Sequence, residues 1–304
     1  MQPKRHPLLW SSAAITLVIV GAIWGRAFFF HQTNNQPVAA YLLPIDANSR
    51  VKLTWWHTKT LRLPVTLHSG EQASIPANAT IRVVHTDSGD VENVTGPAKL
   101  ILQQKIPSEP EALISPLAEI VKTAKVVAKK LTNDFAITSP IGVTRYLNPL
   151  ITWTAREGVL YDVAVLDPAD PMVPPRVAEK VRPPVALADL ETPQRRQLAV
   201  DRNYELIIRE TGATNVIGGA HFLTAPNSQV ENQLPTTPTE LIAEAAAAMA
   251  KKPYRTGDAW LALSHLPADW AKSELGVRLR LRVAADLGLA DELARALEDT
   301  SRLR

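Results

Sequence analysis

The sequence predicts a mainly β protein with added helices: a transmembrane helix near the N-terminus, a small β-roll or meander, a connector helix, a β-sandwich and a C-terminal helical bundle. Three observations predict this class. The chain has 304 residues, which is too long for one small domain. Its 24 prolines favour short edge strands and turns. Its apolar residues repeat with a period of two along the middle and with a helical period near the end.

The composition excludes several classes of function. Hydrophobic residues make up 46% and charged residues 21% of the chain, as in ordinary globular proteins. The lack of cysteine excludes disulfides, thiolate metal sites, a cysteine nucleophile and a lipid-modified cysteine anchor. A net charge of +3, with basic residues spread among the acids, argues against a nucleic-acid partner. The sequence contains no phosphate loop, dinucleotide fingerprint, nucleophile elbow or zincin helix, so we expect no cofactor, no metal and no catalytic residues.

Residues 8–30 read LLWSSAAITLVIVGAIWGRAFFF, with Arg26 as their sole charge. A bilayer core of about 30 Å requires a helix of about 20 residues, so this range is predicted to be a transmembrane signal anchor. Aromatic residues near both of its ends favour the membrane interface. The residues expected to form the anchor are Leu8, Trp10, Ile15, Leu17, Val18, Ile19, Val20, Trp24 and Phe28.

The charges around this range predict its orientation. Lys4 and Arg5 precede it, which places residues 1–7 in the cytoplasm and the bulk of the chain outside. The alternative is a cleaved signal peptide, because residues 38–40 (VAA) resemble a small-residue cleavage site. The apolar range is longer than a signal peptide needs, which favours the uncleaved anchor.

Residues 31–48 begin with polar residues and contain two prolines, so they are predicted to be a tether. A small β domain is predicted over residues 49–105, where apolar residues alternate with polar ones as on the buried face of a strand. The alternating residues are Leu61, Leu63, Val65 and Leu67, and turn signals lie at residues 69–71, 87–90 and 96–97.

The stretch LHSGEQASIPANATIRVVHTDSGDVENVTGPAKLIL in this domain resembles the FecR-type periplasmic domain. It runs as a glycine turn, small residues, a β run, a second turn and a Gly-Pro-Ala before the last strand. The resemblance implies an extracytoplasmic β module of a transmembrane sensor or regulator. FecR proteins carry an anti-sigma region ahead of the span, whereas this chain has seven residues there. The difference argues against sigma-factor regulation, so a sensor of this kind would act through a membrane partner.

Residues 106–135 are predicted to be a linker that contains one amphipathic helix. Ser115 followed by Pro116 suits an N-cap and a first helical position. The helix either touches a membrane or a partner with its basic face, or packs as a connector against a neighbouring sheet. The lack of an aromatic residue on the apolar face favours the connector. The apolar face comprises Leu117, Ile120, Val121, Ala124, Val127, Ala128 and Leu131, and the basic face comprises Lys122, Lys125 and Lys129.

Residues 136–228 are predicted to form a β-sandwich, because short strands there are divided by prolines and turns. A proline precedes a strand that carries Trp153, and Tyr161 begins an alternating strand. These positions, with a later strand at residues 204–208, resemble fibronectin type III and related immunoglobulin-like modules. The resemblance implies a fold and leaves the function open.

Residues 229–304 are predicted to be helical. Thr237, Pro238 and Glu240 fit a capping box with proline at the first helical position. The run LRVAADLGLADELARALED resembles half of a tetratricopeptide-like helix pair, but repeat solenoids need about three copies. A small bundle docked on the sandwich is therefore predicted. Its further helices are expected at residues 258–263, 269–287 (ended by Gly288) and 290–297.

Trp55 and Trp56, followed by His57, are the candidate ligand platform for a carbohydrate or an aromatic group. The alternative is a strand whose aromatic rings fill a small core. Asp167 and Asp170 lie in the run DPADP, which fits a turn better than a calcium site because too few oxygen ligands are near.

These observations predict a non-enzymatic protein anchored in a bacterial inner membrane by a single span, whose extracytoplasmic bulk binds a protein or the cell wall. One alternative is a FecR-like sensor that acts through a membrane partner. The other is an envelope enzyme with an unrecognised site near His57 or His221. The sequence leaves the oligomeric state open.

Overall fold

The computed structural model describes residues 36–53, 59–105, 111, 113–131, 135–190, 197–227, 231, 233–250 and 252–303. The predicted anchor at residues 8–30 and the candidate platform of Trp55, Trp56 and His57 lie outside these ranges. Of the helices within them, none is both long enough and apolar enough to cross a bilayer.

The first module is a β-roll of two antiparallel sheets, with strand orders β4-β1-β6-β7 and β3-β2-β5-β8. Their facing side chains, including Leu42 and Ala73, enclose a core. Leu61 and Leu67 are buried, as the alternation predicts. Leu63 is exposed instead, because it lies in a bend before β4. The strands are β1 (Val38–Pro44), β2 (Arg50–Leu53), β3 (Lys59–Thr60), β4 (Val65–His68), β5 (Gln72–Ile75), β6 (Thr80–His85), β7 (Val91–Thr95) and β8 (Ala98–Ile101).

Strand β1 corrects the prediction that residues 31–48 form a tether. It is an inner strand of its sheet, and every residue of it is buried. Ala40 and Leu42 face the core of the roll, whereas Tyr41 and Leu43 face the helices. Because both faces are covered, the strand lacks the period of two that marks a half-buried strand.

The connector helix is α2 (Leu117–Ala128). Its predicted apolar face packs against helices α6 and α7, defined below, rather than against a sheet, and its three predicted lysines are exposed. The N-cap differs from the prediction: Pro116 occupies it without a side-chain capping bond. Ser115 Oγ instead accepts a hydrogen bond from the backbone N–H of Glu111 at 2.8 Å.

The second module is a two-layer β-sandwich with its own core. One sheet has the order β10-β16-β15-β12-β13 and the other has the order β14-β11-β9. Strand β9 pairs with β11, whereas β10, which follows it directly, pairs in parallel with β16 in the other sheet. The strands are β9 (Ile137–Ser139), β10 (Gly142–Thr144), β11 (Leu150–Trp153), β12 (Tyr161–Leu166), β13 (Arg176–Val181), β14 (Val185–Ala186), β15 (Asn203–Glu210) and β16 (Val216–Thr224).

Aromatic residues fix the inner faces of this sandwich. Trp153 on β11 contacts Tyr161 on β12 edge-on, with ring centroids 5.4 Å apart. Tyr204 on β15 stacks on Phe222 of β16 at 5.5 Å. The Tyr204 hydroxyl accepts a hydrogen bond from the backbone N–H of Ala199 at 2.8 Å. The hydroxyl thus ties the segment that leads into β15 to the core.

The C-terminal helices begin at the predicted Thr237 cap, with one of the two backbone bonds of a capping box. Thr237 Oγ1 accepts a hydrogen bond from the backbone N–H of Glu240 at 3.3 Å and donates to its carboxylate at 2.8 Å. The range 269–287, expected as one helix, is divided because Ser273 caps a new helix. Gly288, with φ of 73°, ends that helix as predicted. The helices are α3 (Pro238–Ala250), α4 (Thr256–Ser264), α5 (Ala268–Ala271), α6 (Glu274–Leu287), α7 (Ala290–Asp299) and the 3-10 helix η3 (Thr300–Arg302).

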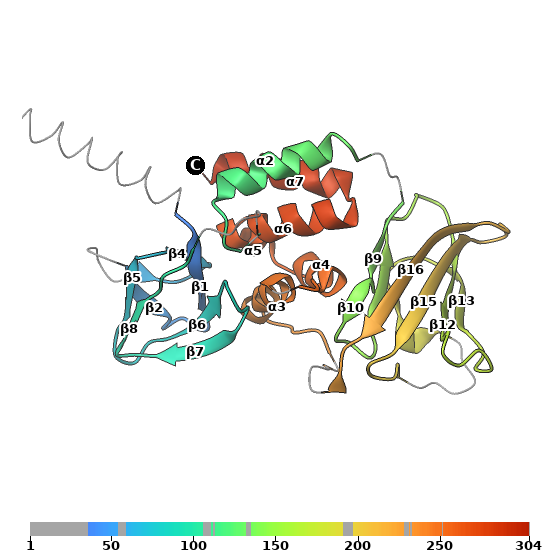
Figure 1. Cartoon of the computed structure of the whole chain (residues 1–304), viewed down its shortest axis with the longest axis horizontal. Helices are drawn as coiled ribbons and strands as arrows, with labels where there is room; N and C mark the ends of the chain where they lie inside the picture. The colour runs from blue at the N-terminus through green and yellow to red at the C-terminus, as the bar shows by residue number, and fades with distance from the viewer. Residues whose placement is uncertain are drawn as a thin grey trace, which may run out of the picture.

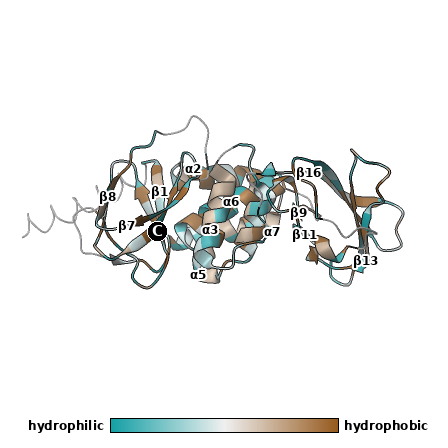
Figure 2. Cartoon of the chain, turned by 90° about the horizontal axis from the view of Figure 1, so that it is seen from below, coloured by the Kyte–Doolittle hydropathy of each residue, from teal (hydrophilic) through white to brown (hydrophobic). Residues whose placement is uncertain are grey.

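The helices lie between the two β modules, with the roll on one side and the sandwich on the other (Figures 1 and 2). Side chains of β1 and β6 share one core with α2, α3, α4, α6 and α7. Helix α4 also lies against β9 and β10 of the sandwich. The bundle is therefore docked on both modules rather than on the sandwich alone. Several β-sheets with C-terminal helices confirm the predicted mixed class at this level.

Candidate binding pocket

The structure does not bring the sequence-predicted candidates together. His221 lies exposed on β16, where Glu205 of β15 is its cross-strand neighbour. Asp167 and Asp170 occupy the turn between β12 and β13, as the sequence predicts, and Asp167 pairs with Arg202 at 2.7 Å. Within the described ranges no group of three or more His, Cys, Asp or Glu side chains is placed to hold a metal ion.

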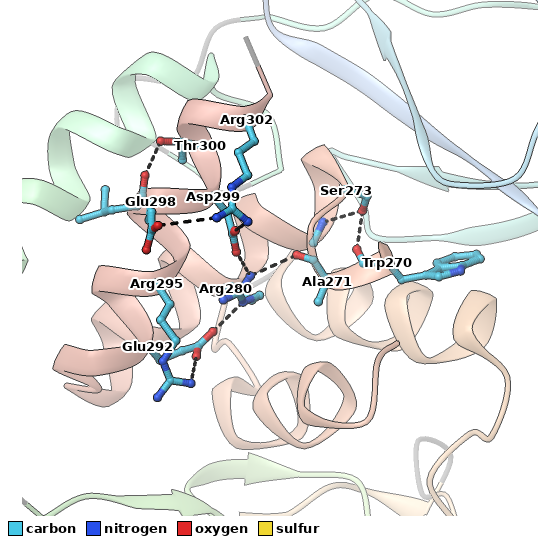
Figure 3. A network of polar contacts seen from close by, with 12 residues as sticks. Trp270, Ala271, Ser273, Arg280, Glu292, Arg295, Glu298, Asp299, Thr300 and Arg302 are labelled. Atoms are coloured by element: carbon cyan, nitrogen blue, oxygen red, sulfur yellow. Dashed lines mark hydrogen bonds and ion pairs between the residues drawn. The ribbon is translucent and has the colours of Figure 1, made fainter. Parts of the chain in front are cut away.

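A pocket of about 420 Å³ opens among the C-terminal helices. Figure 3 shows the polar network of several residues that line it, among them Arg280, Glu292 and Asp299. Helices α4 and α5 supply an apolar wall, while α6, α7 and η3 supply mostly charged side chains. The apolar wall comprises Trp260, Leu263, Ala268 and Ala271, and the charged side comprises Lys272, Arg280, Glu292, Arg295, Glu298, Asp299 and Arg302.

Arg280 forms the charged floor of this pocket. Its Nε donates to Glu292 at 2.6 Å and its Nη1 donates to Asp299 at 2.8 Å. The three side chains are only 10–15% exposed. Burial acts to lower the pKa of Arg280, but the hydrogen bonds to Asp299 and Glu292 outweigh it and hold that pKa above its ordinary value. Arg280 therefore stays charged, and the two carboxylates already compensate its charge.

The mouth of the pocket carries cations that are far less engaged. The side chains of Arg295 and Arg302 are 68% and 59% exposed. Arg295 lies 3.4 Å from Glu292, and Arg302 lies 3.3 Å from Asp299. Because both guanidiniums are largely exposed and their contacts are long, each pair contributes about 1 kcal/mol, so a ligand can displace it at little cost. Exposed Lys272 adds a third cation to the rim.

A tight junction between α5 and α6 positions the apolar wall. Ser273 Oγ donates to the Trp270 carbonyl at 2.6 Å and accepts from the Gly276 N–H at 3.2 Å. A Cβ on Gly276 would lie 2.3 Å from the Trp270 carbonyl oxygen, which is far inside contact distance. Glycine at this position lets α5 approach the first turn of α6 and sets Ala271 at the edge of the pocket.

A second charged cluster lies between α3, α4 and the sandwich. Glu244 pairs with Arg145 at 2.7 Å and with Arg255 at 3.0 Å. Asp258 accepts from Thr144 Oγ1 at 2.7 Å and pairs with Arg255 at 3.0 Å. Burial raises the pKa of Asp258 above its ordinary value, although Arg255 and Thr144 act to lower it. Because both carboxylates are buried and fully engaged, we assign this cluster to holding the modules together.

The pocket residues escaped the sequence analysis, although one signal pointed to them. Acidic and basic residues of α7 and η3 recur at spacings of three and four, which places them along one helix face. The same spacing marks a solvated helix surface, so it does not by itself indicate a pocket. Arg280 of α6 distinguishes a pocket from a solvated helix surface, because it pairs with Glu292 and Asp299 of α7 from another helix.

Comparison with known proteins adds little. No protein-family model and no curated protein matches the chain. Among solved structures it is similar to a two-domain fibronectin type III segment of chicken tenascin, at 10% identity and a TM-score of 0.19. That match covers 61% of this chain and 91% of the tenascin segment. A TM-score this low carries no argument about the fold. The evidence for the sandwich is its own strand order.

Proposed function

We propose that this protein is a non-enzymatic scaffold of a bacterial envelope, anchored in the inner membrane by residues 8–30, with its bulk outside the cytoplasm. Its β modules and helical bundle act as one interaction body, and the pocket among α4 to α7 is the binding site for a partner. The partner is another envelope protein or a cell-wall component.

The observation that carries the proposal is the fixed placement of two β modules on one bundle. Tyr41 and Leu43 of the roll lie in the core of the bundle, and Glu244 joins the bundle to the sandwich through buried ion pairs. Modules joined by flexible linkers move independently, whereas joints of this kind hold their spacing. Modules held at a fixed spacing suit a protein that presents several binding surfaces to its partner at once.

The sandwich suits an immunoglobulin-like module of the fibronectin type III kind. The hydrogen bond from the Ala199 N–H to Tyr204, near the start of β15, has the form of the tyrosine corner of these sandwiches. The parallel pairing of β10 with β16, after β9 has paired with the other sheet, fits the same architecture. These features support an immunoglobulin-like fold of the sandwich. The support for a binding site comes from the pocket.

The pocket favours a partner segment that carries an apolar side chain next to an acidic group. Trp260 and Leu263 offer apolar surface, and Arg295, Arg302 and Lys272 surround the mouth. A carboxylate bound between the two arginines would gain charge-assisted hydrogen bonds shorter than the 3.4 Å and 3.3 Å bonds that they now donate to Glu292 and Asp299.

A reporter pair tests the anchor and its orientation. One fusion to the C-terminus carries a reporter that is active only outside the cytoplasm, and the other carries one that fluoresces only inside. We expect the outside signal alone. An inside signal would overturn the extracytoplasmic part of the proposal.

Site-specific photocrosslinking in the full chain tests the pocket. A photoreactive residue at Ala268, on the apolar wall, should yield one discrete crosslinked product in cells. Reversing the rim with Arg295→Glu and Arg302→Glu should lower its yield at least about tenfold, because two attractive contacts become repulsive.

The matched control is Arg62→Glu with Arg182→Glu, two exposed arginines outside the pocket whose reversal changes the net charge equally. This pair should leave the yield unchanged. Equal yields from all three proteins would show that the pocket does not bind the partner.

A further inference from the structure

The two sheets of the roll have different surroundings. The sheet β4-β1-β6-β7 contributes Tyr41, Leu43 and Val84 to the core of the bundle. The sheet β3-β2-β5-β8 lies on the side of the roll away from the helices (Figure 1). Its outer face therefore has no covering element within the described part of the chain.

Three of the outward positions of this second sheet are basic. Lys52 and Lys99 flank Ser74 in one cross-strand row, because Lys52 pairs with Ser74 and Ser74 pairs with Lys99. Arg50 lies two residues further along β2 on the same face. Ile101, two residues from Lys99 on β8, is 54% exposed. We call Arg50, Lys52, Lys99 and Ile101 the basic face.

The basic face carries no opposing charge of its own. Strands β2, β5 and β8 contain no acidic residue, and the three cations are exposed. None of the three has an ion-pair partner among the described residues. The carboxylates of the adjoining turns, Asp46 and Glu71, accept hydrogen bonds from backbone N–H groups instead.

The chain enters the roll at the end of this same sheet. The Pro37 carbonyl accepts from the Ser69 N–H at 2.9 Å, and the Leu102 carbonyl accepts from the Gly70 N–H at 2.9 Å. The start of β1 is thus adjacent to the turn before β5 and to the end of β8. Between the predicted anchor, which ends at residue 30, and β1 lie seven residues, which span at most about 25 Å when fully extended.

We propose that the basic face binds anionic phospholipid headgroups and seats the roll on the membrane beside its own anchor. This inference rests on the proposed anchor. A linker of seven residues keeps the sheet close to the leaflet that faces away from the cytoplasm, where anionic phospholipid headgroups would attract cations within about a Debye length of 8–10 Å. Ile101, at the entry end of the sheet, is placed to enter the headgroup region first.

The rival basic surface is that of α2, whose lysines 122, 125 and 129 are also exposed. That helix lies beside α7 on the bundle (Figure 1). It begins near the entry of the chain, because the Val38 N–H donates to the Ile114 carbonyl at 2.8 Å, but its lysines follow from its second turn onward. Its three lysines provide a control of equal charge.

The full chain, reconstituted in vesicles, tests the proposal. Because the sequence has no cysteine, Ser74→Cys places one fluorophore in the middle of the basic face, and Glu157→Cys places one on the sandwich. The vesicles are phosphatidylcholine alone or phosphatidylcholine with about one third phosphatidylglycerol, each with a headgroup-bound quencher. We expect stronger quenching at position 74 in the anionic vesicles and no difference at position 157.

Two triple variants assign the effect to a surface. Arg50→Gln, Lys52→Gln and Lys99→Gln together should abolish the extra quenching, since each cation near an anionic surface strengthens binding about fivefold. Lys122→Gln, Lys125→Gln and Lys129→Gln together should leave it intact. Loss of the effect in the α2 variant alone would overturn the proposal.

Alkaline extraction of the same vesicles distinguishes a failure of the proposed anchor from a failure of the proposed lipid contact of the basic face. If the chain is released, the anchor and this inference fail together. If the chain is retained but quenching at position 74 is equal in both lipids, only the seating of the roll is overturned. Equal unfolding midpoints of the two triple variants and the unsubstituted chain confirm that the comparison concerns folded protein.

Discussion

The two β modules are joined to the same helical bundle by different kinds of contact. At the roll the joint is apolar, because β1 and β6 contribute side chains directly to the core of the bundle. At the sandwich the joint is mainly polar: the sandwich keeps a separate core and meets the bundle through Glu244, Asp258 and two arginines, with partly buried Ile141 packed against both cores.

This difference has consequences for how each joint fails. An apolar joint loses stability in proportion to the buried surface removed, and its neighbours relax into the space. A buried ion cluster tolerates no such partial loss, because removal of one carboxylate leaves uncompensated cations in a low-dielectric site. A single substitution should therefore cost more stability at the polar joint than at the apolar joint.

The largest expected effect is at the polar joint. Glu244→Ala removes the buried carboxylate that bridges Arg145 and Arg255, and among the described residues it leaves Arg145 with the exposed Glu231 alone and Arg255 with Asp258 alone. We expect a loss of about 3–5 kcal/mol in the free energy of unfolding. Denaturant unfolding measures the loss, and limited proteolysis between β16 and α3 reports whether the sandwich detaches first.

Glu231→Ala is the matched control for that substitution. Glu231 also pairs with Arg145, at 3.5 Å, but its side chain is 51% exposed. An exposed pair of this kind contributes about 0–1 kcal/mol. If the two variants lose equal stability, the difference drawn between buried and exposed charge at this joint is wrong.

The next effect is at the apolar joint, where adjacent residues of β6 allow a paired test. Val84 lies in the core shared with the bundle, whereas Val83 lies in the core of the roll, and both are fully buried. Replacing either valine by alanine should cost about 1–3 kcal/mol. Hydrogen exchange should distinguish them: Val84→Ala should deprotect amides of α3 and α6.

The companion substitution, Val83→Ala, should deprotect the sheet β3-β2-β5-β8 instead. A shared pattern of exchange for both variants would mean that roll and bundle open as one unit, and the roll would then not be a separable module.

The smallest effect is the response of the joints to acid. Glu274 of α6 accepts hydrogen bonds from Thr66 of the roll and from Arg278. Burial acts to raise the pKa of Glu274, but Arg278 and these hydrogen bonds hold it below its ordinary value of 4.5. Its contribution to stability is therefore complete above pH 4.5 and is lost as the pH falls through the lower, folded-state pKa.

Asp258 at the polar joint should respond with the opposite sign. Its folded-state pKa lies above the ordinary value of 3.8, so the folded protein binds the proton first and this group favours folding more as the pH falls toward 3.8. Unfolding free energies at about pH 6 and pH 4 test both groups. Glu274→Gln should reduce the loss in acid, and Asp258→Asn should increase it; the same change in both variants would contradict the assignment.

Local sequence patterns predicted much of the fold. The cap at Thr237 and the glycine stop at Gly288 were readable because their bonds join residues a few positions apart. The apolar face of α2 was readable for the same reason, although its partner, the pair α6 and α7, was not. Strand β1 was missed because burial on both faces removes alternation.

The candidate pocket and the joints were beyond sequence reasoning. Arg145 and Glu244 are about a hundred positions apart, and only the packing of α3 and α4 on each other and of α4 on the sandwich makes them partners. Arg280 likewise meets Glu292 and Asp299 through a helix hairpin whose register no local pattern specifies. Polar residues in such positions look like ordinary surface charges until the tertiary structure buries them.

The shared core of the roll and the bundle also sets an order of events during synthesis. Val38, Tyr41 and Leu43 are made roughly two hundred residues before α3 and α6, the helices that contact the roll. Contacts between the two ends of a chain form late, because closing so long a loop is slow. Until the final helices emerge, the first module exposes an apolar strip that favours aggregation. A chaperone that holds this strip during translation or export would therefore act on β1 and β6, and a chain that lacks α3 and α6 would keep it exposed.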